Sequence, residues 1–229
     1  MDDTGGRRKK GGASEIPRVS GCLHHCGAVA VSGRVVFLDR DGVINRDSPD
    51  YVKSWKEFTF IPGSLTAIRD LTRAGYRLIL ITNQSAVNRG MITLNQLEDM
   101  HSRMTAAIRG RGGNITDIFF CPHRPDEACD CRKPKPGMIR AAQAKYDIDL
   151  TESVMVGDSA KDMRCAENAG CGGRVLVLTG NGVESRERLA RENRSPDFMA
   201  ENLLYAAEWI LNRPQNNSAK RIDKKKNLP

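Results

Sequence analysis

Two carboxylates lie one residue apart where a short apolar stretch of the sequence ends. Asp39 and Asp41 follow the β-branched and aromatic run 35–38 and are followed by Gly42. Side chains two apart on a strand point to the same face, so both carboxylates are expected to emerge together from the end of a buried strand. Their mutual repulsion is relieved if a divalent cation or a transferred proton occupies the space between them.

Two simpler interpretations compete with a chemical role for this pair. Asp and Gly are common in solvated turns after a strand. A calcium loop of the helix-loop-helix kind is a second alternative, but its fifth and sixth positions would be Val43 and Ile44 instead of a polar ligand and a glycine. The calcium loop is therefore excluded, and the turn and the metal-carboxylate site remain open.

Further polar groups follow the later apolar stretches of the chain. Each of them alone fits an ordinary polar loop, a surface basic pair or a helix cap. Together they supply a hydroxyl that suits a phosphate oxygen, two cations held by a proline-stiffened loop, and two more carboxylates. These residues are Thr82, Arg132, Lys133, Asp158 and Asp162.

The loop 121–131 carries three thiols and one imidazole in two closely spaced pairs. The ligands would be Cys121 with His123, and Cys129 with Cys131. Three thiolates and one imidazole complete a closed tetrahedral zinc site, which is structural and not catalytic, whereas incidental cysteines are the alternative. The loop has few apolar residues to bury, which favours the zinc interpretation.

The remaining four cysteines fall outside that loop. Cys165 and Cys171 are expected to be small buried residues. Near the N-terminus, a second group could also ligate a metal, although it has no predicted element around it; it comprises Cys22, His24, His25 and Cys26.

Strand-like and helix-like stretches alternate from residue 35 onward, which predicts an α/β fold with a doubly wound, mostly parallel sheet. The expected strands are 35–38, 76–81, 115–120, 153–156 and 175–178. The expected helices begin near Ser64 and Thr93 and cover about 137–146, 160–169 and 200–211. In such sheets ligands bind beyond the carboxyl ends of the strands, where the polar groups above are placed.

Length and charge divide the 229 residues into one domain with two extensions. We expect a flexible N-terminal extension over 1–33, a folded domain over 34–212 that holds the candidate site and the loop 121–131, and a basic tail over 213–229. The net charge of +8 separates into +2, +1 and +5 over these segments, so nucleic-acid binding by the central domain is not expected. Seven cysteines without a signal peptide or a membrane-spanning stretch predict a cytoplasmic protein, and we expect a monomer.

The combined pattern resembles the haloacid dehalogenase-type phosphatase superfamily over roughly 34–180. The resemblance implies that Asp39 attacks phosphorus and that Asp41 acts as general acid and then general base. It also implies a Mg²⁺ ion held by Asp39, the Asp41 backbone carbonyl and Asp158, with Thr82 and Lys133 stabilising the phosphoryl group.

The zinc loop and the neighbouring motifs resemble one branch, the D-glycero-D-manno-heptose-1,7-bisphosphate 7-phosphatases, with the bacterial histidinol-phosphate phosphatases as close relatives. The space between motifs leaves no room for a large cap domain. The resemblance implies a small phosphorylated sugar as substrate, contacted by Arg132, Asp47, Tyr51, Asn83, Gln84, Ser85 and Ser159.

Two positions depart from the branch pattern. Val43 stands where Thr is frequent, and Ser159 stands where some heptose phosphatases have Lys. Val43 bears on the acid/base properties of Asp41, and the absence of the lysine cation at position 159 leaves the anomer preference and the sugar open. Histidinol-phosphate hydrolysis, a nucleic-acid end phosphatase and a zinc-stabilised nucleic-acid-binding module therefore remain as alternatives.

Overall fold

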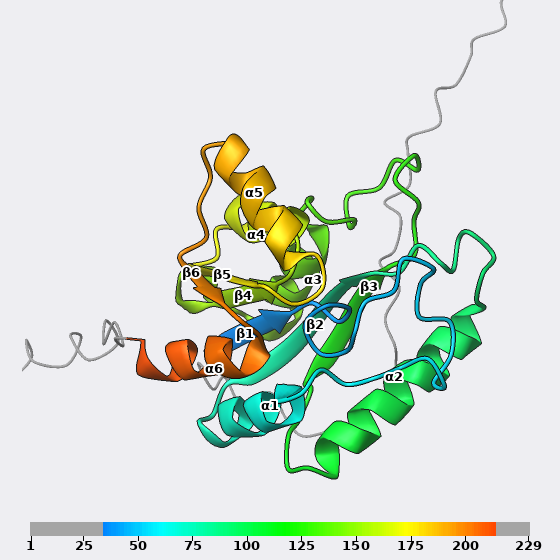
Figure 1. Cartoon of the computed structure of the whole chain (residues 1–229), viewed down its shortest axis with the longest axis horizontal. Coiled ribbons are helices and arrows are strands. Elements are labelled where there is room, and N and C mark those ends of the chain that lie inside the picture. The colour runs from blue at the N-terminus through cyan, green and yellow to red at the C-terminus, as the bar shows by residue number, and fades with distance from the viewer. Residues whose placement is uncertain (1–33, 214–229) are drawn as a thin grey trace, which may run out of the picture.

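The computed structural model describes residues 34–213, which form a parallel sheet covered by helices on both faces (Figure 1). The six strands lie in the order β3-β2-β1-β4-β5-β6, and every neighbouring pair is parallel. Their bounds are β1 Val35–Leu38, β2 Arg77–Asn83, β3 Asp117–Cys121, β4 Val154–Gly157, β5 Gly173–Val177 and β6 Phe198–Ala200.

The central strand β1 is apolar at every position because both of its faces are covered. It pairs with β2 on one side, where Phe37 lies opposite Ile79, and with β4 on the other, where Phe37 lies opposite Met155. The strand order reverses at β1. Such a reversal opens a crevice beyond the carboxyl ends of the strands, at the point where Asp39 leaves β1.

Two helical layers enclose the sheet (Figure 1). On one face lie α1 Ser64–Arg73, α2 Leu94–Arg109 and α6 Leu203–Asn212, which pack with strand residues such as Val36 and Leu80. On the other lie α3 Gly137–Tyr146 and α4 Ala160–Ala169, which pack with residues such as Phe37 and Ile81; α5 Gly182–Arg191 packs on α4. A short 3₁₀ helix, Leu150–Glu152, precedes β4.

The predicted order of strands and helices is confirmed, and no large cap interrupts the described residues 34–213. Thr93 begins α2 with the capping box that its spacing to Gln96 predicts. Helix α1 begins at Ser64, near the expected position, and Gly63 in the left-handed conformation precedes it as the N-cap residue. Helix α5 and strand β6 were not predicted. Within the described part of the chain, no helix has the length and apolar character to cross a membrane.

Candidate active site

A cavity of about 520 Å³ opens beyond the carboxyl ends of β1, β2 and β4. Nearly all of the predicted site residues of the sheet edge line it, although their segments are far apart in the sequence. Those residues are Asp39, Asp41, Asp47, Tyr51, Thr82, Asn83, Ser85, Arg132, Lys133, Asp158 and Ser159. Gln84, which was also expected to contact substrate, does not line it.

Three carboxylates and one ammonium group form a cluster at this cavity: Asp39, Asp158 and Lys133 line it, and the fully buried Asp162 lies next to them. Oxygen atoms of Asp39, Asp158 and Asp162 all lie within 4.8 Å of one another. The Nζ atom of Lys133 lies 2.8 Å from Asp39 Oδ2 and 2.6 Å from Asp162 Oδ1, and it donates to the carbonyl of Ile81 at 2.9 Å. Lys133 and Asp162 are 2% and 0% exposed, so this group is almost fully removed from water.

The charges of this group do not balance within the protein. Burial raises the pKa of Asp39 to about 7, against the opposing charge of Lys133. Burial and the charges of Asp162 and Asp39 raise the pKa of Asp158 to about 8. Three carboxylates facing one ammonium leave two negative charges when all are ionised, and a divalent cation would neutralise them. The residues present therefore fit a magnesium ion, whose preferred ligands are oxygen atoms.

Two glycines make room for the Asp158 carboxylate. Gly42 and Gly180 both have positive φ, at 77° and 58°. A Cβ atom on either residue would lie 2.1 or 2.2 Å from Asp158 Oδ2, far inside van der Waals contact. The two loops can approach Asp158 only because neither position carries a side chain.

Asp41 accepts hydrogen bonds from three neighbouring side chains. Arg40 binds it through Nε and Nη2 at 3.1 and 2.8 Å, Asn45 donates to Oδ1 at 2.8 Å, and Gln84 donates to Oδ2 at 2.9 Å. Burial alone would raise the pKa of Asp41, but the charge of Arg40 and these hydrogen bonds outweigh it and hold the pKa below its usual value. Asp41 is therefore held as a carboxylate.

Gln84 links Asp41 to Thr82. Its Nε2 atom donates to both Asp41 Oδ2 and Thr82 Oγ1, each at 2.9 Å, and the residue is 3% exposed. Because Thr82 Oγ1 accepts from Gln84, its own proton is free for an acceptor in the cavity. Gln84 is buried next to the cavity, where its amide orients these two side chains.

The two cations before α3 are positioned by different partners. Asn83 fixes the Lys133 backbone from both sides: it accepts from Lys133 N–H at 3.1 Å and donates to the Lys133 carbonyl at 3.2 Å. Arg132 donates through Nη1 to the backbone carbonyl of His123 at 2.9 Å. The conformation of the cysteine loop therefore determines where the Arg132 guanidinium lies.

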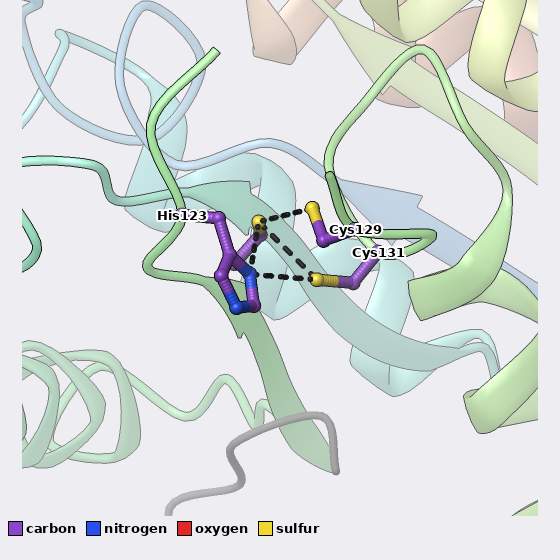
Figure 2. A group of neighbouring side chains, drawn as sticks. His123, Cys129 and Cys131 are labelled. Atoms are coloured by element: carbon purple, nitrogen blue, oxygen red, sulfur yellow. Dashed lines mark hydrogen bonds between the residues drawn. The ribbon is translucent and has the colours of Figure 1, made fainter. Parts of the chain in front are cut away.

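The four predicted zinc ligands converge in that loop (Figure 2). Cys121 and Cys131 Sγ lie 3.3 Å apart and are 3.4 and 3.3 Å from His123 Nδ1, and Cys121 Sγ lies 3.8 Å from Cys129 Sγ. Ligands at tetrahedral angles on one zinc ion would lie roughly 3.5–3.8 Å apart, given typical Zn–N and Zn–S distances. The donor set and its spacing fit a zinc ion.

The other two cysteines of the described region differ in burial. Cys165 is buried, as expected, and Cys171 is only partly buried. The candidate group Cys22, His24, His25 and Cys26 lies outside the described residues.

Sequence reasoning missed the residues that the C-terminal part of the chain adds to the cavity. Asn181, just before α5, donates to Asp158 Oδ2 through its backbone N–H at 2.8 Å and its amide at 3.2 Å, and to Asp47 Oδ2 at 2.7 Å. It thus connects the carboxylate cluster with the loop 47–51. Lys161, Glu184, Ser185 and Arg188 also line the cavity. Asn181 follows β5. The rule that ligands bind beyond the carboxyl ends of parallel strands, which placed Asp158 after β4, would also have identified Asn181 as a candidate.

Comparisons with known proteins agree with this site. The HAD-hydrolase-like family model matches residues 130–206. The chain is 47% identical to a D-glycero-beta-D-manno-heptose-1,7-bisphosphate 7-phosphatase of Bordetella bronchiseptica over 78% of this chain and 98% of that protein. It is also 47% identical to a Pseudomonas putida protein of the same name, over 68% of this chain and 88% of that one.

A solved structure is similar as well. The D,D-heptose 1,7-bisphosphate phosphatase of B. bronchiseptica, complexed with magnesium and phosphate, superposes with a TM-score of 0.73 at 43% identity, covering 78% of this chain and 98% of that one. The corresponding enzyme of Burkholderia thailandensis gives a TM-score of 0.60 at 32% identity, covering 79% and 99%. The chain therefore belongs to the D-glycero-β-D-manno-heptose-1,7-bisphosphate 7-phosphatase family of haloacid dehalogenase-like hydrolases.

Proposed function

We propose that this chain is a magnesium-dependent phosphatase that removes the 7-phosphate from D-glycero-β-D-manno-heptose 1,7-bisphosphate. The observation that carries this proposal is the convergence of Asp39, Asp41, Thr82, Lys133 and Asp158 on one cavity. The names of the similar proteins support the sugar and its β anomer over histidinol phosphate and over a nucleic-acid end. The product would serve nucleotide-heptose synthesis for lipopolysaccharide or other glycans.

The reaction would proceed in two steps through a phosphorylated Asp39. In the first, a carboxylate oxygen of Asp39 bonds to phosphorus while the bond from phosphorus to the sugar oxygen breaks and Asp41 supplies a proton to that oxygen. In the second, Asp41 takes a proton from water, the water oxygen bonds to phosphorus, and Asp39 is released as a carboxylate. Lys133 and the free proton of Thr82 would stabilise the phosphoryl oxygens.

The hydrogen bonds of Asp41 favour one of its two proposed roles. Its carboxylate accepts from Arg40, Asn45 and Gln84, which suits the base that activates water in the second step. For the first step Asp41 must first take up a proton, against these donors. We therefore expect the acid step to be the more sensitive of the two to high pH.

Asp39 and Asp158, with the backbone carbonyl of Asp41 that the family resemblance implies, would hold the magnesium ion. Asp162 is engaged by Lys133 and by Ser159, which donates to its Oδ2 at 2.6 Å, so we assign it the role of positioning Lys133. When bound, the ion neutralises charge on the phosphoryl oxygens. The cysteine loop would hold a structural zinc ion through Cys121, His123, Cys129 and Cys131.

A bisphosphate needs a second anion-binding region away from the reacting group. Arg132 and Lys161 both line the cavity. Among the residues described here, Lys161 has no hydrogen-bond or ion-pair partner, so its charge is available to a ligand. The Ser159 hydroxyl donates to Asp162, so it is already engaged within the protein. We propose that Lys161 and Arg132 supply the positive charge for the remaining phosphate.

The wider setting follows from the proposed substrate. We propose a cytoplasmic enzyme that acts on this small soluble molecule as a monomer. The near-neutral charge of residues 34–212 argues against nucleic acid as the substrate.

The experiment that tests this proposal compares substrates on the full-length protein in magnesium buffer. Phosphate release is measured with the α and β anomers of heptose 1,7-bisphosphate and with histidinol phosphate. We expect the highest kcat/KM for the β anomer, with the phosphate at C1 retained in the product. A higher kcat/KM for histidinol phosphate would overturn the substrate assignment.

A further inference from the structure

A buried arginine and a buried histidine lie behind Asp41. Arg40 stands between the two site carboxylates in the sequence, yet it is 1% exposed and is the largest fully buried side chain of the described region. Its Nε and Nη2 atoms bind Asp41, and its Nη1 atom lies 3.3 Å from Nε2 of His101 on helix α2. His101 is also 1% exposed.

The contact between Arg40 and His101 determines the protonation state of the imidazole. A guanidinium group only donates hydrogen bonds, so His101 Nε2 must be the acceptor. The imidazole is then neutral, with its hydrogen on Nδ1. A second positive charge beside the Arg40 guanidinium would be repelled in this buried environment.

A merely structural role does not account for a histidine at position 101, because its burial costs folding free energy. Its Nδ1 atom is buried and has no hydrogen-bond partner among the described residues. A buried donor without an acceptor disfavours folding, and an apolar side chain of similar size would avoid that cost. The ring also packs edge-on against Phe120, with ring centroids 6.1 Å apart, which limits its rotation.

We propose that His101 is a positioning residue for Asp41, acting through Arg40. By accepting from Nη1, it fixes the third corner of the guanidinium, so that Nε and Nη2 are held against the Asp41 carboxylate. Asn45 and Gln84 also donate to that carboxylate, one to each oxygen, and complete its orientation. This inference rests on the proposed acid/base role of Asp41.

The acceptor at position 101 can be removed or retained by substitution. His101→Leu removes it and fills a similar volume, whereas His101→Gln keeps an acceptor at a similar distance from the backbone. Met104→Leu, at a fully buried position on the same helix, is the matched control for repacking. kcat, KM and the unfolding temperature are measured for all three variants with heptose 1,7-bisphosphate.

We expect His101→Leu to lower kcat by about tenfold or more with KM changed less than about twofold, since a small misplacement of an acid/base group slows the chemical step. Its unfolding temperature should change little, because the unpartnered Nδ1–H is removed with the ring while the buried Arg40 Nη1 atom loses its acceptor. His101→Gln should recover most of kcat, and Met104→Leu should leave kcat unchanged. His101→Met carries the same expectation and replaces the leucine variant if that variant does not fold.

The variant Asp41→Asn is included so that failure of the positioning role of His101 can be distinguished from failure of the proposed acid/base role of Asp41. If Asp41→Asn is inactive while His101→Leu keeps the wild-type kcat, the positioning role is wrong and the proposed function stands. If Asp41→Asn keeps full activity, the acid/base assignment is wrong and the positioning role is wrong with it. Equal loss of kcat in the leucine and glutamine variants would also contradict a role for the acceptor.

Discussion

The ammonium of Lys133 lies 2.8 Å from the carboxylate of Asp39, in a position where it also binds Asp162. Burial would lower the pKa of Lys133, but the two carboxylates outweigh it and hold the pKa above its usual value. The lysine therefore stays charged where it lines the cavity, beside the atom proposed to attack phosphorus.

Replacing this lysine should damage the reaction more than substrate binding. In Lys133→Met the Asp39 and Asp162 carboxylates lose their shared cation, and the phosphoryl oxygens lose a positive partner. We expect kcat to fall by about 10²–10³-fold, as for removal of one donor to a developing negative charge. Steady-state kinetics measure the change. Lys56→Met, at an exposed position, is the control and should be unaffected.

Asn181 should couple the metal site to the loop that faces the substrate. Asn181→Ala keeps the backbone hydrogen bond to Asp158 but removes the amide contacts to Asp158 and Asp47. We expect a several-fold rise both in the Mg²⁺ concentration for half-maximal activity and in KM, by loss of charge-assisted hydrogen bonds. Asn114→Ala, at an exposed position before β3, is the control, and equal behaviour of the two variants would contradict the coupling.

Zinc removal should affect the position of Arg132 before it affects the catalytic carboxylates. We expect one zinc ion per chain by elemental analysis, and Cys129→Ser should lower both the zinc content and the unfolding temperature. Because Arg132 is anchored on the His123 carbonyl, KM should also rise. Cys171→Ser is the control. A zinc-free wild-type protein with unchanged unfolding temperature and KM would contradict the structural zinc site.

The buried His101 should make stability depend on pH. Burial and the charge of Arg40 lower the pKa of His101 from 6.5 to about 3, against the weaker opposing effect of Asp41. Below pH 6.5 the unfolded chain therefore binds a proton that the folded chain does not, so this contribution is complete above pH 6.5 and is lost as the pH falls toward 3.

Denaturant unfolding at several pH values between 7 and 5 measures that contribution. As the pH is lowered, the free energy of unfolding of the wild type should fall more steeply than that of His101→Gln. The difference in slope should reach at most about 1.4 kcal/mol per pH unit. Subtracting the two curves removes the effect of the carboxylates common to both proteins. Parallel curves would show that His101 takes up its proton equally in both states.

Much of this molecule could be predicted from its sequence. The apolar run that ends at Asp39 and the alternation of elements predict a parallel sheet, and parallel strands bring Asp39, Thr82 and Asp158 to one edge. The spacing of Cys121, His123, Cys129 and Cys131 predicts their cluster because the loop is short. These predictions depend on local sequence patterns and on the rule that parallel strands end at the same edge of a sheet.

The parts that could not be predicted depend on tertiary contacts. Helix α5 is strongly charged and follows a glycine-rich turn, so it has no clear apolar pattern, and it packs mainly on α4. Strand β6 has three residues and is set by its pairing with β5. The position of Asn181 after β5 could have been inferred, but its bonds to Asp158 and Asp47, and the bond from Gln84 to Asp41, join residues 23 to 134 positions apart, and no spacing in the sequence reveals these partners.

The most direct test of the account is the activity of Asp39→Asn. The amide keeps the size of the side chain but removes the proposed nucleophile, so phosphate release from D-glycero-β-D-manno-heptose 1,7-bisphosphate should become undetectable. Circular dichroism and the unfolding temperature establish that the variant is folded. We expect a folded, inactive protein; a folded Asp39→Asn variant with wild-type kcat would contradict catalysis through a phosphorylated Asp39.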